Sequence, residues 1–595
     1  MKHITNSTKF SLFLFLFIPT AIFYCMEAFL CNPFEKQNLS IQLLNILFFQ
    51  LFTLIGLFFL KKAKYILRAE CVIFCLTGLV NYFILAFRGT PFMPWDLFSL
   101  KTAASVADNY NYTVDIKALL VILMFIVLFW LSGRCDIIVT KKKLRLSVGL
   151  ISLILLFTLF FYVQSQQAQR IFRFYDKLFT PTTMTFRNGT LVTLILQSKY
   201  LSVEKPAGYS LEKADEILAS YKNKGASLNK ITPGSTVSIE EELPSIIVIM
   251  NEAFSDLNIL GDFTTNTDYL PFVHSLLKGV DNTQSGIANV SVLGGNTANS
   301  EFEFLTSQSM AFLPQGSIPY QQYLKKQSFS LASYLKDLGY ETVAIHPYGA
   351  SGWQRDFVYP RLGFDTFYSL EDFKNPEKIR KYISDKHNYE KIIEFYEKKD
   401  NNRPLFLFNV TMQNHSSYSE EFENFTPSIQ VTGSEDKSLS QYLSLLKISD
   451  EEIKKLISYF KNQEEKVLLL FFGDHQPTDS VVRDIWLQNN KNPAELSHQD
   501  QRLRYQVPFF LWANYDIEEA FLQETSLNYL ALRVLRAANL PLSEYYSFLS
   551  TQEESFPVIS AIQAKDSQQN SYEITEIKEK LADYAILQYY YLFDR

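Results

Sequence analysis

The chain has 595 residues, 15% of them aromatic, and a formal net charge of −6 at pH 7. This length is too great for one hydrophobic core, and the aromatic content is high for a wholly soluble protein. The negative charge, with no basic stripe interleaved with aromatic residues outside the membrane loops, gives no reason to expect a nucleic-acid-binding protein.

Five apolar runs in the first part of the chain are long enough to cross a lipid bilayer. They lie at about 10–30, 42–60, 68–87, 116–132 and 146–164. Cleavage of the first run as a signal peptide is the alternative, but that run ends in Glu27 and Phe29 rather than in small residues. The sequence therefore predicts a five-helix transmembrane domain over residues 1–165.

Basic residues gather in two of the loops between these runs. They are Lys61, Lys62, Lys64 and Arg68 after the second run, and Arg134, Lys141, Lys142, Lys143 and Arg145 after the fourth. Short cytoplasmic loops carry an excess of Lys and Arg. We therefore expect a multi-pass protein of the cell membrane whose large C-terminal part is extracellular.

All cysteines of the chain lie in the membrane part. They are Cys25, Cys31, Cys71, Cys75 and Cys135. An extracellular domain without cysteine has no disulfide, so its stability must come from its own hydrophobic core. Between the two parts, residues 166–242 are expected to form a juxtamembrane helical linker along the lipid head groups.

From residue 243 onward, apolar stretches of strand length alternate with helical patterns, which favours an α/β domain with a largely parallel central sheet. Four stretches, at 246–250, 341–346, 404–410 and 467–472, end in or just before polar residues. Each alone is typical of a buried strand followed by a loop. The carboxyl ends of parallel strands are, however, where α/β domains carry their chemistry. We expect the catalytic domain over 243–550 and a C-terminal helical tail over 551–595.

The side chains at these strand ends include two carboxylates and an imidazole that suit a metal ion. Glu252, Asp474 and His475 form a ligand set typical of Mn²⁺ or Mg²⁺ and also accepted by Zn²⁺. Thr297 follows a Gly-Gly-Asn turn at the start of a predicted helix, where a threonine is usually a cap. As a fourth ligand, its hydroxyl would be acidified by the metal and become a nucleophile.

The motifs together resemble a known family. They are Asn-Glu-Ala-Phe-Ser-Asp at 251–256, Gly-Asn-Thr-Ala-Asn-Ser-Glu-Phe at 295–302, Trp-Gln-Arg-Asp at 353–356, Asn-His at 414–415 and Gly-Asp-His at 473–475. The chain is similar to the lipoteichoic acid synthases and related phosphoglycerol transferases of Gram-positive bacteria, in the alkaline phosphatase and sulfatase superfamily. This resemblance covers nearly the whole chain and implies five transmembrane helices followed by an extracellular α/β sulfatase-like domain.

The resemblance also implies roles for individual residues. Thr297 would be the nucleophile and, with Glu252, Asp474 and His475, would bind one Mn²⁺. The residues expected around the phosphoglycerol group are His346, Trp353, Arg355 and His415. Of these, Arg355 would grip phosphate oxygens and His415 would transfer a proton. The alternatives are that Trp353 and Arg355 lie in a surface loop and that His346 only ends its strand.

The expected activity is transfer of sn-glycerol phosphate from phosphatidylglycerol in the membrane to a cell-surface teichoic acid or glycan. The first ligand is followed by alanine and the nucleophile turn reads Gly-Gly-Asn-Thr-Ala-Asn. These features resemble the subgroup that decorates surface polysaccharides more than the polymerising synthases. The alternatives are a phosphoethanolamine transferase or phosphatase of the same superfamily, and a non-catalytic membrane protein that binds the cell wall. Sulfatase activity is not expected, because the Cys- or Ser-x-Pro-x-Arg site is absent from the sequence.

Overall fold

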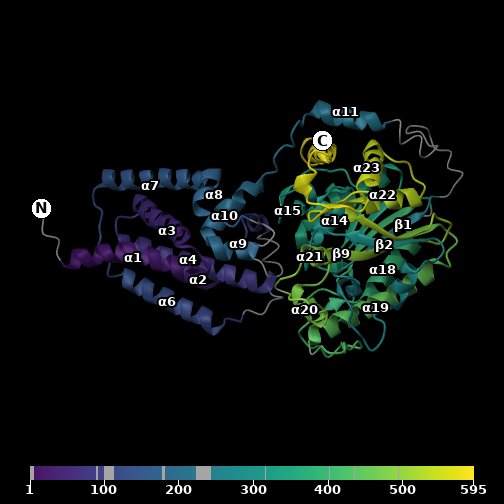
Figure 1. Cartoon of the computed structure of the whole chain (residues 1–595), viewed down its shortest axis with the longest axis horizontal. Helices are drawn as coiled ribbons and strands as arrows, with labels where there is room; N and C mark the ends of the chain where they lie inside the picture. The colour runs from purple at the N-terminus through teal and green to yellow at the C-terminus, as the bar shows by residue number, and fades with distance from the viewer. Residues whose placement is uncertain are drawn as a thin grey trace. The chain divides into compact units, whose positions relative to one another are not determined.

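A computed structural model describes residues 6–88, 91–99, 113–176, 181–222, 243–314, 316–400, 402–434, 436–493 and 495–595 (Figure 1). The chain divides into two compact units. One comprises Met1–Val203 with Pro314–Ser317, and the other comprises Glu204–Leu313 with Ile318–Arg595. Residues 177–180 and 223–242 of the expected linker lie outside the described residues, and the domain limits expected from the sequence remain a prediction.

Within the described part of the N-terminal unit, four helices are long and apolar enough to cross a membrane. They are α1 (Asn6–Ala28), α3 (Leu39–Phe59), α4 (Ala63–Arg88) and α7 (Lys142–Val163). Four of the expected spans are therefore confirmed by length and composition. The fifth corresponds to α6 (Ile116–Ser132), which is apolar but has 17 residues. The Asp115 side chain caps the start of this helix by accepting a hydrogen bond from the Ala118 N–H. Because α6 is short, a count of five membrane spans remains a prediction.

Short helices follow these spans at one end of the unit. They are α2 (Pro33–Lys36), α8 (Gln166–Phe172), α9 (Pro181–Asn188) and α10 (Thr190–Ser198). A β-bridge between Lys62 and Ile138 joins the segment after α3 to the segment before α7. The last turn of α7 therefore lies at the same end of the unit as the first turn of α3, next to α2.

The C-terminal unit is built on an eight-stranded sheet with the order β10-β2-β9-β8-β1-β7-β3-β4. The strands are β1 (Ser245–Asn251), β2 (Thr283–Asn289), β3 (Glu341–Ile345), β4 (Thr366–Tyr368), β7 (Leu405–Val410), β8 (Val467–Gly473), β9 (Gln506–Ala513) and β10 (Ala520–Ser526). The five strands from β8 to β4 are mutually parallel, and only β9 runs antiparallel to its neighbours. The expected α/β domain with a largely parallel sheet is confirmed.

Both faces of this sheet are covered, as its continuous apolar strands require. Alternate residues of β1, Ile247 and Ile249, belong to one core with residues of α13 (Pro271–Leu277), α18 (Asp385–Lys398) and α19 (Lys437–Phe460). On the opposite face, α14 (Thr297–Thr306) packs through Phe304, whose ring lies 5.6 Å from that of Phe408 on β7 and 5.2 Å from that of Phe472 on β8. All ten residues of α14 are buried.

The end of the chain packs on the segment through which the chain enters this unit. Helix α11 (Leu211–Tyr221) contacts α23 (Glu544–Ser555) and α24 (Ala582–Tyr589), and the hydroxyl of Tyr209 donates a hydrogen bond to Asp594. Residues 551–595, expected as a helical tail, also contain a small antiparallel sheet. Its strands are β11 (Val558–Ile559), β12 (Ala564–Lys565) and β13 (Ser571–Tyr572).

Candidate active site

Glu252 and Asp474 lie side by side because their strands are parallel neighbours. Strand β1 ends one residue before Glu252 and β8 one residue before Asp474, and Asn251 pairs with Gly473. A Cβ atom on Gly473 would lie 1.8 Å from the carbonyl oxygen of Phe254, so only glycine allows this close approach. The ligand atoms of Glu252, Asp474 and the adjacent His475 lie within 4.8 Å of one another, and all three residues are buried.

Two atoms of this cluster are suited to a cation. Among the described residues, neither Asp474 Oδ2 nor His475 Nε2 has a hydrogen-bond partner, although both are buried and lie 3.2 Å apart. His475 Nδ1 lies 2.9 Å from the carbonyl oxygen of Gln476, which can only accept, so Nδ1 carries the proton and Nε2 offers a lone pair. Asp474 Oδ1 is held by the N–H groups of Ala253 and His475, at 2.7 and 2.8 Å.

The raised pKa of Glu252 also supports a cation at this cluster. Burial and the neighbouring Asp474 carboxylate raise the pKa of Glu252 well above its ordinary value, and the Arg355 charge only partly opposes this. Two buried carboxylates this close need a positive charge between them to remain ionised together. The donor set, the burial and the unpartnered atoms therefore fit a divalent cation.

Thr297 is the first residue of α14, directly after a strained turn. Gly294, Gly295 and Asn296 have φ values of 65°, 150° and 63°, and the wide φ of Gly295 suits glycine alone. This turn brings Thr297 Oγ1 to 3.4 Å from Glu252 Oε2. The N-terminus of α14 lies at the same place, where the helix dipole favours a negatively charged group.

Arg355 is buried and paired with a residue that sequence reasoning missed. Its guanidinium donates through Nε, at 3.0 Å, and through Nη2 to the carboxylate of Glu301, which also accepts a 2.6 Å bond from the Tyr359 hydroxyl. Arg355 is 2% exposed and Glu301 is fully buried. Glu301 follows Thr297 by four residues, which places both on one face of α14. That spacing is the only signal for Glu301 in the sequence.

Trp353 lies in a tight loop immediately before Arg355. Trp353 and Gln354 both have left-handed backbone conformations, with φ values of 55° and 61°. Such strain in two consecutive bulky residues persists only where the surroundings impose it, and it is common at functional sites. The Trp353 side chain is half-buried. The structure thus places Trp353 beside Arg355, while a contact with substrate remains a prediction.

His346 directly follows β3 and is buried, whereas His415 lies in the loop after β7 and is half-buried. His346 Nδ1 lies 3.0 Å from the Val410 carbonyl oxygen, and His415 Nδ1 lies 2.9 Å from that of Ser416, so both rings carry their proton on Nδ1. Burial lowers the pKa of His346 well below its ordinary value and that of His415 to about 4. Both rings are neutral near pH 7 and offer Nε2 as an acceptor.

A buried polar network supports the strand ends from behind. The Asn251 amide donates to Asp385 at 3.0 Å, and the Asn414 amide donates to Asn251 at 2.8 Å. Ser449 on α19 donates to the same Asp385 carboxylate. These bonds connect β1 and the loop after β7 to α18 and α19, so they fix the positions of Glu252 and His415.

Comparisons with known proteins agree with this architecture. The sulfatase family profile matches residues 244–540. A Rhizobium meliloti protein proposed to modify cyclic beta-1,2-glucan is 26% identical over 76% of this chain and 69% of its own length. The lipoteichoic acid synthase of Staphylococcus saprophyticus is 23% identical over 63% of this chain, and the match spans only 56% of that synthase.

Two solved structures share the fold. The Streptococcus pyogenes phosphoglycerol transferase GacH, in complex with sn-glycerol-1-phosphate, has a TM-score of 0.53 and 23% identity, covering 66% of this chain and 96% of its own. The integral membrane protein lipooligosaccharide phosphoethanolamine transferase A of Neisseria meningitidis has a TM-score of 0.50 and 15% identity, covering 88% of this chain and 95% of its own. Residues 244–540 thus form a sulfatase-family domain, and the chain is a lipoteichoic acid synthase-like membrane protein of the alkaline phosphatase and sulfatase superfamily.

Proposed function

We propose that the chain is a membrane-anchored glycerophosphotransferase. It moves sn-glycerol phosphate from phosphatidylglycerol, through a glycerophosphoryl-threonine, to a hydroxyl of a cell-surface teichoic acid or wall polysaccharide. One observation carries the proposal: the Thr297 hydroxyl, at a buried helix N-terminus, lies beside the cluster of Glu252, Asp474 and His475. Two structures that share the fold are a phosphoglycerol transferase and a phosphoethanolamine transferase, and the basic loops predict an outward C-terminal unit; both support the proposal.

The cation is proposed to be Mn²⁺, held by Glu252, Asp474, His475 and the Thr297 hydroxyl. The same oxygen and nitrogen donors also accept Mg²⁺ or Zn²⁺. When bound, the ion supplies positive charge that lowers the pKa of the threonine hydroxyl and stabilises the phosphoryl oxygens. Asp474 and His475 bring to it the two buried atoms that have no partner among the described residues.

In the first step the Thr297 oxygen attacks phosphorus and forms an O–P bond, while the bond between phosphorus and the diacylglycerol oxygen breaks. Diacylglycerol leaves with the proton that Thr297 loses. In the second step an acceptor hydroxyl attacks the same phosphorus and His415 accepts its proton through Nε2. The bond between phosphorus and the Thr297 oxygen breaks, and that oxygen regains a proton as His415 releases its own. The N–H groups of the first turn of α14 stabilise the charge that develops on the phosphoryl oxygens.

Arg355 and its neighbours are proposed to hold the phosphoglycerol group. Because Glu301 fixes the Arg355 guanidinium from one side, Arg355 presents its charge in one orientation, and Nη1 donates a 3.4 Å hydrogen bond to the Gly352 carbonyl oxygen instead of to Glu301. Trp353 would line the glycerol, and His346 would accept a hydrogen bond from it through Nε2. A neutral His346 suits a polar, uncharged glycerol hydroxyl.

The test compares Thr297→Ala with Thr297→Ser in the purified full chain with Mn²⁺ and phosphatidylglycerol. Thr297→Ala should lose diacylglycerol release by about 10³-fold or more, and should lose the covalent glycerophosphoryl adduct seen by mass spectrometry. Thr297→Ser, which keeps a hydroxyl, should retain both in part. Thr306→Ala, at the other end of the same helix, is the control for damage to α14.

Three results would refute this function. Turnover retained by Thr297→Ala would exclude Thr297 as the nucleophile. A covalent adduct formed from phosphatidylethanolamine but not from phosphatidylglycerol would identify a phosphoethanolamine transferase instead. The Neisseria meningitidis protein that shares the fold is a transferase of this kind. Absence of any turnover together with absence of Mn²⁺ binding would favour a non-catalytic protein that binds the cell wall.

A further inference from the structure

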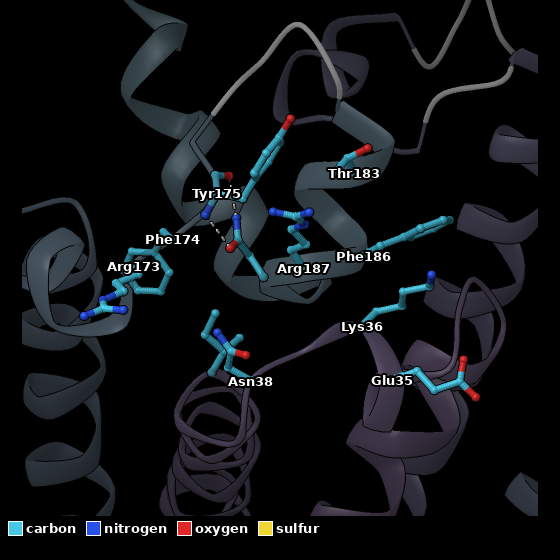
Figure 2. Close-up of a pocket in the computed structure, with 11 residues that line it drawn as sticks. Glu35, Lys36, Asn38, Arg173, Phe174, Tyr175, Thr183, Phe186 and Arg187 are labelled. Carbon is cyan, nitrogen blue, oxygen red and sulfur yellow. Dashed lines mark hydrogen bonds between the residues drawn. The ribbon is translucent and has the colours of Figure 1, made fainter. Parts of the chain in front are cut away.

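The N-terminal unit has a pocket of about 560 Å³, which is remote in sequence from every residue of the candidate active site. Figure 2 shows side chains from α2, from the segment after α8 and from α9 surrounding it. The lining residues with charged side chains are Glu35, Lys36, Arg173 and Arg187, and the aromatic ones are Phe174, Tyr175 and Phe186. Its volume is within the range of small-molecule sites.

The pocket lies at the end of the membrane helices. Helix α2 connects the end of α1 to the start of α3, and the segment after α8 follows the end of α7. Because the bridge between Lys62 and Ile138 joins the other ends of α3 and α7, all these termini share one end of the unit. The basic loops lie at the opposite end, so this end is predicted to face outward.

Buried hydrogen bonds connect the pocket wall to a membrane helix. The side-chain amide of Asn188 accepts from the Tyr175 N–H at 3.0 Å and donates to the Tyr175 carbonyl at 2.8 Å. The buried Asn45 of α3 donates to the Asn188 carbonyl at 2.8 Å, and a Cβ on Gly189 would lie 2.7 Å from this Asn45 nitrogen. Polar groups inside membrane helices are costly and usually functional. The hydrogen bonds of Asn45 and Asn188 therefore indicate that this wall has a defined structure with a functional role.

The pocket carries an excess of positive charge. Among the described residues, no carboxylate forms an ion pair with Lys36, Arg173 or Arg187, and Arg187 lies 4.9 Å from the centre of the Tyr175 ring. The single acidic lining residue, Glu35, accepts a hydrogen bond from the Asn32 amide at 2.8 Å. Three exposed cations beside aromatic side chains at a membrane end match a phosphate group at the level of the lipid head groups.

We infer that this pocket binds the phosphate-bearing head group of an anionic phospholipid. Lys36, Arg173 and Arg187 contact the phosphate, and the aromatic side chains pack against the head group and the upper part of the acyl chains. The pocket shares no residue with the metal cluster of the C-terminal unit. The inference goes beyond the proposed function and does not rest on it, because lipid binding here requires no chemistry at Thr297.

The test measures lipid binding to the purified full chain in detergent by native mass spectrometry, with a chelator present to remove divalent cations from the C-terminal site. Phosphatidylglycerol is titrated against the wild type, the double variant Arg173→Gln/Arg187→Gln and the control Arg170→Gln. Arg170 is exposed on α8, next to the pocket, but does not line it. Thermal unfolding of each variant checks that the N-terminal unit remains folded.

We expect the double variant to bind phosphatidylglycerol about 25-fold more weakly than the wild type, because each basic side chain contributes about five-fold. Arg170→Gln should stay within about two-fold. If the double variant does not fold, Lys36→Gln, at an exposed position, should still show the five-fold loss. Unchanged affinity in these pocket variants would overturn the inference.

Two further measurements fix the chemistry of the ligand. Phosphatidylcholine should bind about 25-fold more weakly than phosphatidylglycerol, and equal affinity would exclude a site for anionic lipids. Soluble sn-glycerol phosphate should not displace the lipid at equal concentration, and efficient displacement would identify a site for free phosphate esters. Diacylglycerol release is assayed separately. A pocket that does not bind anionic lipid can therefore be distinguished from a chain that is not a glycerophosphotransferase.

Discussion

Replacing Glu301 by glutamine should strongly destabilise the C-terminal unit. The change keeps the shape of the side chain but removes the negative charge facing the buried guanidinium of Arg355. Removing one partner of a buried ion pair costs about 3–5 kcal/mol, because the other charge is left uncompensated. The Tyr359 hydroxyl also loses a charged acceptor, because the Glu301 carboxylate becomes a neutral amide. We therefore expect a loss of about 4 kcal/mol in unfolding free energy, or roughly 10³-fold in the folding equilibrium.

Glu303→Gln is the matched control, because Glu303 lies on the same helix and is equally buried. It accepts hydrogen bonds from the Ser291 hydroxyl and the Met310 N–H, at 2.8 and 2.9 Å, and the described residues include no basic partner for it. Burial raises the pKa of Glu303 to about 7, so much of its charge is already absent near neutral pH. Its replacement should cost about 1 kcal/mol.

The assay is pulse proteolysis of the full chain in urea, which follows the band of the C-terminal unit and does not require both units to unfold together. Glu301→Gln should lower the urea midpoint far more than Glu303→Gln. Equal shifts for the two variants would refute the reasoning that the Arg355 charge depends on Glu301.

Three other outcomes are expected. Saturating Mn²⁺, at about 100 times its dissociation constant, should stabilise the full chain by about 3 kcal/mol in thermal unfolding, and Asp474→Asn should remove this response. Gly473→Ala should cost about 3 kcal/mol, because the new Cβ would overlap the Phe254 carbonyl oxygen, and a stability equal to wild type would contradict the observed close approach. Burial opposes protonation of His274, but hydrogen bonds to two aspartates outweigh it and raise its pKa to about 9. The interaction of protonated His274 with these aspartates should stabilise the fold by about 2 kcal/mol at pH 6 and lose that contribution as the pH rises from 6.5 to 9. His274→Gln should flatten this part of a plot of the urea midpoint against pH.

The sequence was sufficient to predict the strands that carry the site. Strands β1, β7 and β8 each contain an apolar run of four or more residues, and β3 ends in three apolar residues, because both faces of the sheet are covered. Strand β2 was not predicted, since Thr283–Asn289 contains polar residues and Gly286, whose Cβ would lie 1.8 Å from the Gln523 carbonyl oxygen. Its position, second from one edge of the sheet, depends on pairing with β9 and β10, which are distant in the chain, and periodicity does not encode this pairing.

Only part of the candidate site could be predicted, because the sequence shows where strands end but not which strands are neighbours. A residue at the end of an apolar run can be named from the sequence, as Glu252 and Asp474 were. The order of the strands cannot, and it is this order that makes β1 and β8 neighbours. The pairing of Arg355 with Glu301 joins residues 54 positions apart and arises only because the start of α17 (Arg355–Arg361) lies against α14.

The hydrogen bond between Tyr209 and Asp594 has a practical consequence for work on this protein. The final residues cover the entry segment, where the rings of Tyr209 and Tyr589 lie 4.7 Å apart. Deleting residues 582–595 would expose α11 and leave that segment open to proteases. Purification tags and reporter fusions are therefore better placed at the opposite terminus.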